Sequence, residues 1–220
     1  MRRATATGAL GRATGRPRFA AIWAGVALAC GLAGAGVPSP MTFTAQSAPC
    51  QETLTASGSI EANTPSDFQA ALSGVPAERR RGMTIAINSN GGDVAAAMRL
   101  GAMFRELRVR VIVARADPAR PGKLRGGFCV SACVYAMMGA ERRVALAESL
   151  VGLHRMFIPT GLGAHRVAEP ALVTEVRSYA QGMGVSGNLV IAAESQVPQL
   201  VHVMSRAEMT AWGLVTAEAQ

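Results

Sequence analysis

The chain has 220 residues, of which 50% are hydrophobic and 16% are charged, so it can bury a core and is not disordered. Its formal net charge is +8, but five arginines precede the first acidic residue, Glu52, and subtracting their charges leaves +3. Aromatic residues make up only 5% of the chain, which disfavours stacking on bases. The composition therefore favours a globular domain without a nucleic-acid partner.

The first 37 residues have the pattern of a targeting segment. An arginine-rich stretch ends at Arg18, and an uncharged run rich in Ala and Gly follows from Phe19 to Val37. This order is typical of a secretory signal peptide or an N-terminal membrane anchor. Ala33-Gly34-Ala35 offers a cleavage site of small residues, so cleavage and retention both stay open. In either case we expect an exported, periplasmic domain, attached to the inner membrane if the anchor is retained.

Export places the cysteines in an oxidising compartment. Cys50, Cys129 and Cys133 follow the targeting segment, which is an odd number. Cys129 and Cys133 lie four residues apart around a predicted tight turn and can form a disulfide, while a bond from Cys50 to either one is the alternative. No second Cys pair or His cluster has the spacing of zinc ligands, so we expect no metal site.

Residues 38–51 are rich in Pro, Ser, Thr and Ala, which predicts a linker before a domain at residues 52–220. Thr64-Pro65-Ser66-Asp67 is a typical helix start, and Asp93 is predicted to cap a second helix that ends near Leu107. Strand, helix and strand in this order predict a parallel α/β unit with right-handed crossovers. The expected strands are at residues 53–60, 83–88 and 109–114.

The second half of the domain continues with shorter elements. Residues 115–127, rich in Arg, Pro and Gly, predict a loop, and an extended run at residues 128–130 leads through Ser131 into a helix at residues 132–138. We expect two more strands and three more helices, at residues 144–147, 150–154, 169–183, 185–194 and from the Ser205–Glu208 capping box to Gly213.

Three positions could carry chemistry. Gly91-Gly92 follows a strand and can present bare N–H groups to an oxyanion, although a tight strand-to-helix turn also explains two glycines. Ser131 lies between a strand and a helix, and the N–H of Ala132 points at the same space; a helix cap is the alternative. His154 ends an apolar strand, where a structural histidine is the alternative. Because α/β folds bind ligands at the ends of strands, we expect these positions to lie close together.

The order of these features resembles the proteolytic subunit of Clp protease and its relatives in the ClpP/crotonase superfamily. The resemblance extends from about Ile60 to Thr216 and ends with Trp212-Gly213-Leu214-Val215. It is closest to an exported ClpP-like serine protease branch, whose nucleophile motif has the Cys-x-Ser-Ala-Cys form seen at Cys129–Cys133. The resemblance implies an α/β fold with a mainly parallel sheet of repeated β-β-α units flanked by helices.

The resemblance also implies residue roles. Ser131 matches the nucleophile, His154 matches the general base, and the N–H groups of Gly92 and Ala132 match the oxyanion hole. These roles agree with their chemistry, because an imidazole can accept the serine proton near neutral pH and two fixed N–H groups stabilise a tetrahedral oxyanion. A peptide or protein substrate, a homo-oligomer and no cofactor are implied as well.

Three features depart from the family pattern. Asn90 replaces a proline before the glycines, and residues 115–127 are longer than the family's connection and are expected beside the site, as a lid, a carboxylate-binding loop or a solvated loop. Val201 stands where the family has its catalytic aspartate. Glu194 and Glu175 are candidates to orient His154 instead.

The leading hypothesis is an exported serine hydrolase, most simply a peptidase, that uses a Ser131/His154 dyad. A catalytically inactive binding or assembly protein with the same fold is the alternative, because the family acid is missing. A crotonase-type acyl-CoA enzyme is less favoured, because no Asp or Glu adjoins Ser131 in the sequence and an exported protein would not meet CoA. A Ser-Lys dyad with Lys123 does not match the position that such dyads use.

Overall fold

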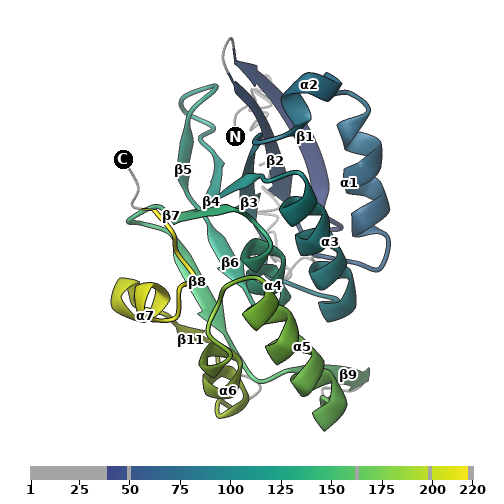
Figure 1. Ribbon diagram of the computed structural model, residues 1–220, viewed down its shortest axis with the longest axis vertical. Helices are drawn as coiled ribbons and strands as arrows, with labels where there is room; N and C mark the ends of the chain where they lie inside the picture. Colours follow the sequence, from purple (N-terminus) through teal and green to yellow (C-terminus); the bar gives the residue numbers. More distant parts are fainter. Residues whose placement is uncertain (1–38, 49–50, 162–163, 198–199, 218–220) are drawn as a thin grey trace, which may run out of the picture. The chain divides into compact units, whose positions relative to one another are not determined.

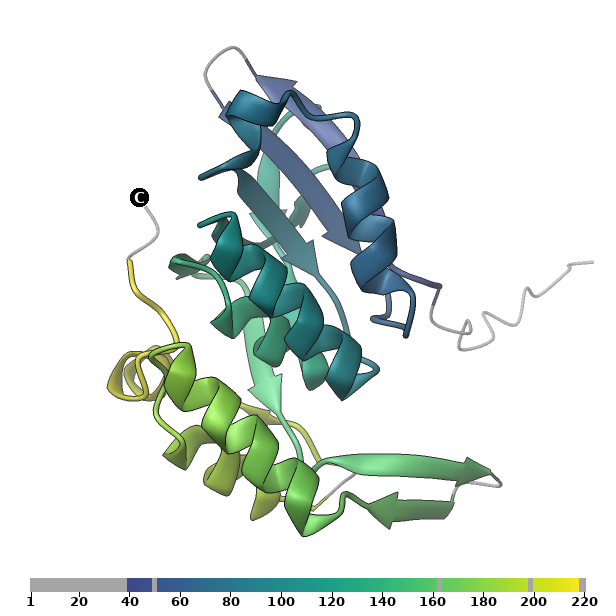
Figure 2. The ribbon, with the colours of Figure 1, turned by 45° about the vertical axis from the view of Figure 1, so that its right-hand side comes forward.

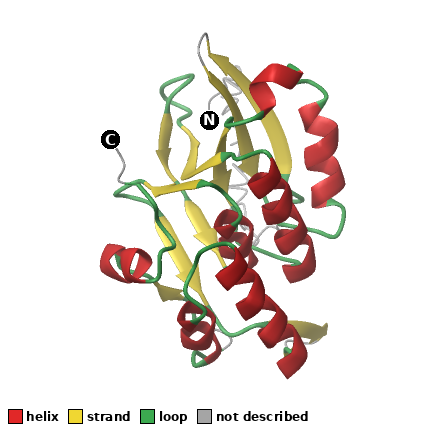
Figure 3. Cartoon of the chain, viewed as in Figure 1, coloured by secondary structure: helices red, strands yellow, loops and turns green. Residues whose placement is uncertain are grey.

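The computed structural model describes residues 39–48, 51–161, 164–197 and 200–217. The predicted targeting segment, residues 1–37, and Cys50 lie outside the described residues. Across the described ranges, no helix combines the length and the apolar character needed to cross a membrane. Residues 39–217 are described below as one unit that contains both strands and helices (Figure 3).

Two sheets form the framework (Figure 1). In the larger sheet the order is β1-β2-β3-β4-β5, and β7 pairs with the same edge of β4 as β5 does; β2, β3, β4 and β7 are parallel. The smaller sheet has the order β11-β8-β6, with β8 and β6 parallel. The strands of these two sheets are β1 (Thr42–Ala48), β2 (Gln51–Ser57), β3 (Thr84–Asn88), β4 (Arg110–Ala116), β5 (Leu124–Gly126), β6 (Phe128–Val130), β7 (Arg142–Ala145), β8 (Leu150–Leu153) and β11 (His202–Val203).

Helices cover the larger sheet because its central strands are apolar on both faces. The first four residues of β3 are buried, as expected for a parallel strand between two layers. Helices α1 and α3 lie side by side over one face (Figure 2), and Phe68 meets Phe104 edge-on at 5.2 Å between ring centroids. The helices are α1 (Thr64–Leu72), α2 (Ala77–Arg80), α3 (Val94–Glu106), α4 (Ala132–Met138), α5 (Pro170–Gly182), α6 (Asn188–Glu194) and α7 (Arg206–Ala211).

The short helix α4 lies at the centre of the fold, and every one of its residues is buried. It packs against α3 through two glycines that bring the backbones together. A Cβ atom on Gly139 would lie 1.9 Å from the carbonyl oxygen of Gly101, so no larger residue fits there without separating the helices. This contact fixes α4, and with it the turn at its N-terminus, relative to α3.

A buried arginine ties the C-terminal segment to α4. Nε of Arg143 donates to Leu214 O at 2.8 Å, Nη1 to Met138 O and Ala140 O at 3.1 and 2.7 Å, and Nη2 to Gly213 O at 2.9 Å. Burial lowers the pKa of Arg143 to about 10, so the guanidinium stays protonated at neutral pH. Arg143 therefore supplies donors to carbonyl groups that helix ends leave without partners.

The predicted capping box is present at the N-terminus of the last helix, α7. Ser205 Oγ accepts from the N–H of Glu208, while Glu208 Oε2 accepts from the Ser205 N–H at 2.7 Å and from its hydroxyl at 2.8 Å. Nε2 of His202 lies 2.8 Å from Glu208 Oε1. The hydrogen bonds from Ser205 and His202 lower the pKa of Glu208 to about 2.

Three sequence-based predictions are wrong. Residues 42–48 of the predicted linker form β1, because Phe43 packs against Phe68, with ring centroids 5.3 Å apart, and the strand pairs antiparallel with β2. Part of the predicted loop at residues 115–127 is a strand, since Gly126 pairs with Ala114 across the β4–β5 hairpin. A further hairpin was missed; it projects at the end of the fold in Figure 2 and consists of β9 (Phe157–Gly161) and β10 (Ala164–Val167).

Candidate active site

Ser131 occupies a strained turn between β6 and α4. Its φ of +56° and ψ of −130° belong to a region that residues other than glycine rarely adopt. Two hydrogen bonds hold this backbone: the Ser131 N–H donates to Gly152 O at 2.9 Å, and the Ser131 carbonyl accepts from Val134 N at 3.0 Å. A strand, a sharp turn and a helix form the geometry that presents a nucleophilic serine in several hydrolase folds.

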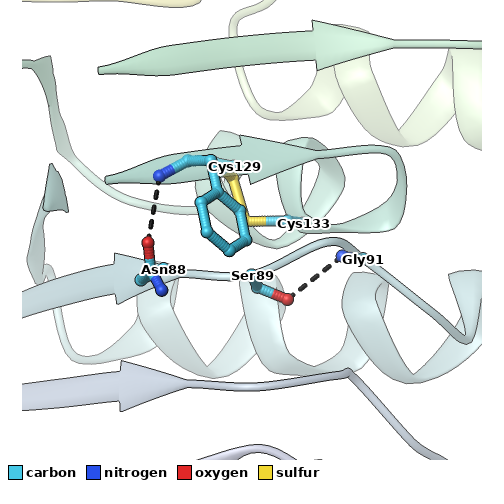
Figure 4. The surroundings of a disulfide bond; sticks show 6 residues. Asn88, Ser89, Gly91, Cys129 and Cys133 are labelled. Carbon is cyan, nitrogen blue, oxygen red and sulfur yellow. Dashed lines mark hydrogen bonds between the residues drawn. A yellow bond between two sulfur atoms is a disulfide. The ribbon is translucent and has the colours of Figure 1, made fainter. Parts of the chain in front are cut away.

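A disulfide bridges the two ends of this turn. The structure joins Cys129 at the centre of β6 to Cys133 on α4, with Cα atoms 5.2 Å apart (Figure 4). This is the first of the two cysteine pairings that the sequence left open. Both cysteines are fully buried, so the bond clamps the Ser131 turn from the side of the core.

The two glycines after β3 lie against the same turn. A Cβ atom on Gly91 would lie 2.6 Å from Val130 O and 2.8 Å from Ala132 N, so this position accepts only glycine at its φ of +95°. Ser89 links the two segments, because its N–H donates to Phe128 O at 2.8 Å and its carbonyl accepts from Val130 N at 3.0 Å.

One side chain also joins the two segments, and another holds the diglycine turn itself. Asn88 Oδ1 accepts from the N–H of Phe128 at 3.1 Å, and Ser89 Oγ accepts from the N–H of Gly91 at 3.1 Å (Figure 4). The end of β3, at Asn88 and Ser89, is therefore held against β6 directly before the diglycine turn. The structure thus brings together two segments that are about forty residues apart in the chain.

Two backbone N–H groups at this junction are without acceptors among the described residues. The N–H of Asp93 donates to Ile60 O at 2.8 Å, whereas the N–H of Gly92 donates to no described group. Ala132 is the first residue of α4, so its N–H has no acceptor within the helix, although the residue is fully buried. A buried N–H without a partner is rare in proteins, so that of Ala132 is a candidate donor to an oxyanion, while the N–H of the exposed Gly92 is open to a ligand.

Ser131, His154 and Gly92 line one pocket, with a volume of about 570 Å³. The sequence predicted that these three residues converge, and they do so although they come from different parts of the chain. Asn90 and Asp93 line the same pocket. The rest of its wall is apolar and consists of Val94, Ala95, Met156, Phe157, Ala168 and Leu172.

The ring of His154 is oriented by a backbone carbonyl. Nδ1 lies 2.7 Å from Arg155 O, and because a carbonyl only accepts, Nδ1 carries a hydrogen; in the neutral ring the lone pair is then on Nε2. The ring also lies beside that of Phe157, with centroids 5.1 Å apart. No hydrogen bond joins the ring to Ser131 Oγ among the described residues; catalytic hydrogen bonds of this kind often form only when substrate is bound.

Glu194 holds the segment that follows His154 rather than its ring. Its Oε1 accepts from the N–H of Met156 at 3.0 Å, and its Oε2 lies 3.7 Å from Nε of Arg155. Burial, with the negative charge of Glu194 as a smaller cause, raises the pKa of Tyr135, so this phenol stays neutral. Glu194 therefore contacts Arg155 and Met156, the two residues that follow His154, and not the His154 ring itself.

Three features considered for the site lie elsewhere. Glu175 is exposed on α5 and makes no described contact with the His154 ring, and Val201, at the family's aspartate position, is 43% exposed. The hairpin at residues 115–127 contributes no residue to the pocket lining and is largely exposed, which favours the solvated loop among the alternatives given for it. The hairpin has this position because β5 pairs with β4.

The sequence argument missed one acid in the pocket. Asp93 was predicted as a helix cap, and its Oδ1 does accept from Ala96 N at 2.6 Å. Asp93 directly follows Gly92, and it also lines the pocket that holds Ser131. The position of Asp93 directly after the diglycine turn was the feature of the sequence that could have placed it at the site.

Comparisons with known proteins agree on the fold. No protein-family model and no curated protein matches the sequence. Among solved structures, a mutant of the 1510-N membrane-bound stomatin-specific protease matches with a TM-score of 0.56 and 18% identity, over 75% of this chain and 77% of that one. Another mutant of that protease, in complex with a substrate peptide, matches with a TM-score of 0.57 and 17% identity, over 75% and 73%. ClpP1 from Listeria monocytogenes matches with a TM-score of 0.55 and 20% identity, over 76% and 91%.

The chain therefore has the ClpP-like fold, a mixed α/β fold with a mostly parallel sheet and flanking helices. This confirms the fold class that the sequence resemblance implied.

Proposed function

We propose that the protein is an exported serine peptidase with Ser131 as nucleophile and His154 as general base. The observation that carries this function is the shared pocket, which holds a serine in a strained turn, a histidine and a backbone N–H without an acceptor. The ClpP-like fold supports it, because the solved structures that match include two proteases, one of them in complex with a substrate peptide.

The geometry supports a two-step reaction. Nε2 of His154 takes the proton of Ser131 Oγ as this oxygen bonds to the carbonyl carbon of the substrate, and the oxyanion accepts hydrogen bonds from the N–H groups of Gly92 and Ala132. The C–N bond then breaks, and Nε2 returns the proton to the leaving amine. A water molecule next gives a proton to Nε2 and attacks the acyl carbon, and Ser131 leaves with that proton.

The missing aspartate has a predictable consequence. The carbonyl of Arg155 can fix the tautomer of His154, as a carboxylate does in a triad. A carbonyl is uncharged, however, and stabilises the imidazolium less than a carboxylate would. We therefore expect turnover that is slow for a serine peptidase, with the oxyanion hole and substrate positioning supplying much of the acceleration.

Labelling with a fluorophosphonate probe tests this function. The wild-type protein is expected to take up the probe, Ser131→Ala to take up none, and His154→Ala to react at least about 100-fold more slowly. Ser73→Ala is the matched control, because it removes an exposed hydroxyl on the surface after α1. A folded wild-type protein that remains unlabelled would favour the second candidate, an inactive binding or assembly protein. The observation that supports this candidate is the lack of a carboxylate at His154.

The remaining expectations belong to the same proposal. The protein acts on peptides or proteins, assembles as a homo-oligomer and is exported with or without its targeting segment. Sedimentation of the purified protein measures the assembly, and N-terminal sequencing of the protein recovered from cells determines whether residues 1–37 are removed. Cleavage within this segment and recovery from the periplasm are the expected results.

A further inference from the structure

Asp93 places a carboxylate at the rim of the pocket. It is the N-cap of α3, and one oxygen, Oδ1, accepts from Ala96 N at 2.6 Å. Asp93 is exposed and lines the pocket, and it forms no ion pair among the described residues. It is also the only acidic side chain among the residues that line the pocket in the described part of the chain. Its second oxygen, Oδ2, is therefore available to a ligand.

The walls around this carboxylate are apolar. Val94, Met156, Phe157 and Leu172 contribute to them, and Met156 is almost fully buried. Arginine and lysine combine an apolar stem with a charged head, so the walls would contact the stem while the carboxylate binds the head. A substrate side chain with a negative charge would be repelled by Asp93, and one without charge would leave Asp93 unpaired.

Asp93 also adjoins the proposed oxyanion hole. It directly follows Gly92, whose N–H is one of the two proposed donors. A negative charge beside a developing oxyanion opposes it, because like charges repel more strongly in a partly enclosed pocket than in water. A substrate cation bound to Asp93 would cancel this repulsion. The cation is therefore expected to raise kcat as well as to lower KM.

We propose that Asp93 makes the protein selective for peptides that carry Arg or Lys next to the scissile bond, a preference that rests on the proposed peptidase activity. The selectivity has two sources: an ion pair with the substrate side chain in the bound state, and relief of repulsion in the transition state. Asp93 is thus a specificity-determining residue of the site.

Fluorogenic peptides test the selectivity. Arg, Lys, citrulline, norleucine and Glu are placed in turn at the two positions on each side of the scissile bond. Citrulline has the shape of arginine without its charge, so the ratio of kcat/KM for Arg to that for citrulline isolates the electrostatic contribution. At one position we expect a ratio of about 10 or more in low salt, falling as salt is added, and poor cleavage of the Glu peptides.

Two variants assign the ratio to Asp93. Asp93→Asn and Asp93→Ser both remove the charge and keep a residue that caps helices well, so at least one is expected to fold. In both, the Arg-to-citrulline ratio should fall to within about twofold of unity. Asp67→Asn is the control, since it removes a charge from the first turn of α1, outside the pocket, and should leave the ratio unchanged.

The outcomes separate this inference from the proposed function. A wild-type protein that takes up the fluorophosphonate probe but cleaves Arg and citrulline peptides equally at every position would overturn the role of Asp93 alone. A ratio that survives in both Asp93 variants would overturn it too. A protein that neither labels nor cleaves overturns the peptidase, and the selectivity with it.

Discussion

Replacing Gly91 by alanine tests whether the diglycine turn positions the nucleophile. Gly91 has a φ of +95°, and an added Cβ would lie 2.6 Å from Val130 O and 2.8 Å from the Ser131 Cβ. The contacted atoms belong to the turn that carries Ser131, and they are held by β6 and by the disulfide. Relief of the overlap must therefore move either the glycine turn or the Ser131 turn.

The magnitude follows from two costs. An alanine at this φ is strained by about 1–2 kcal/mol. The overlap with buried backbone adds about 1–3 kcal/mol, as overpacking of a core does. The expected loss in the free energy of unfolding is therefore about 2–5 kcal/mol. To reach an ordinary contact of 3.4 Å, Val130 O must move about 0.8 Å, and a shift near 1 Å can cost about 100-fold in rate.

Urea unfolding and the rate of fluorophosphonate labelling measure these two effects. Gly122→Ala is the matched control, because Gly122 has a φ of +77° in the β4–β5 hairpin and an added Cβ there meets nothing within 4 Å. It should lose only the strain of about 1–2 kcal/mol and label at the wild-type rate. If Gly91→Ala were no less stable than Gly122→Ala and labelled as fast as wild type, the proposed coupling between the two turns would be wrong.

Three further predictions concern stability. Arg143→Met should lower the free energy of unfolding in urea by about 3 kcal/mol or more, because four buried carbonyl groups each lose a hydrogen bond, while Arg142→Met, at the exposed neighbour, should change it by less than about 0.5 kcal/mol. Reduction of Cys129–Cys133, or replacement of both by alanine, should cost about 2 kcal/mol for so short a loop and slow the labelling of the serine between them; equal stability in oxidised and reduced protein would contradict this. Because the pKa of Glu208 is lowered to about 2 in the folded protein, its contribution is complete above its ordinary pKa of 4.5 and is lost as the pH falls through 2. Urea unfolding between pH 5 and pH 2 should show this loss in the wild type and not in Glu208→Gln.

The candidate site was predictable where residue types carry the signal. Gly91-Gly92, Ser131 and His154 each stood next to a predicted strand end, and the structure places Gly92, Ser131 and His154 around one pocket. The group that orients His154 was not predictable, because the carbonyl of Arg155 belongs to the backbone and every residue has one. A search for a third side chain at Val201 could not find it.

The prediction of a linker where β1 forms was wrong because the burial of that segment depends on a distant residue. The sequence at residues 42–48 is short and follows a stretch rich in Pro and Ser, so its composition favoured a linker. Phe43 is half-buried only because Phe68, from a helix twenty-five residues later, lies beside it. Local composition reports how polar a segment is, and it does not report whether a distant side chain covers the segment.

The amino-acid sequence by itself determined most of the strands and helices, the caps at Asp93 and Ser205, and the turn at Gly91-Gly92. These depend on contacts between neighbours in the chain, which local patterns encode. Tertiary structure alone decided that Asp93 lines the pocket of Ser131 and that Glu194 holds the segment after His154. Those arrangements depend on segments far apart in the chain, and their distances are set by how the buried faces pack.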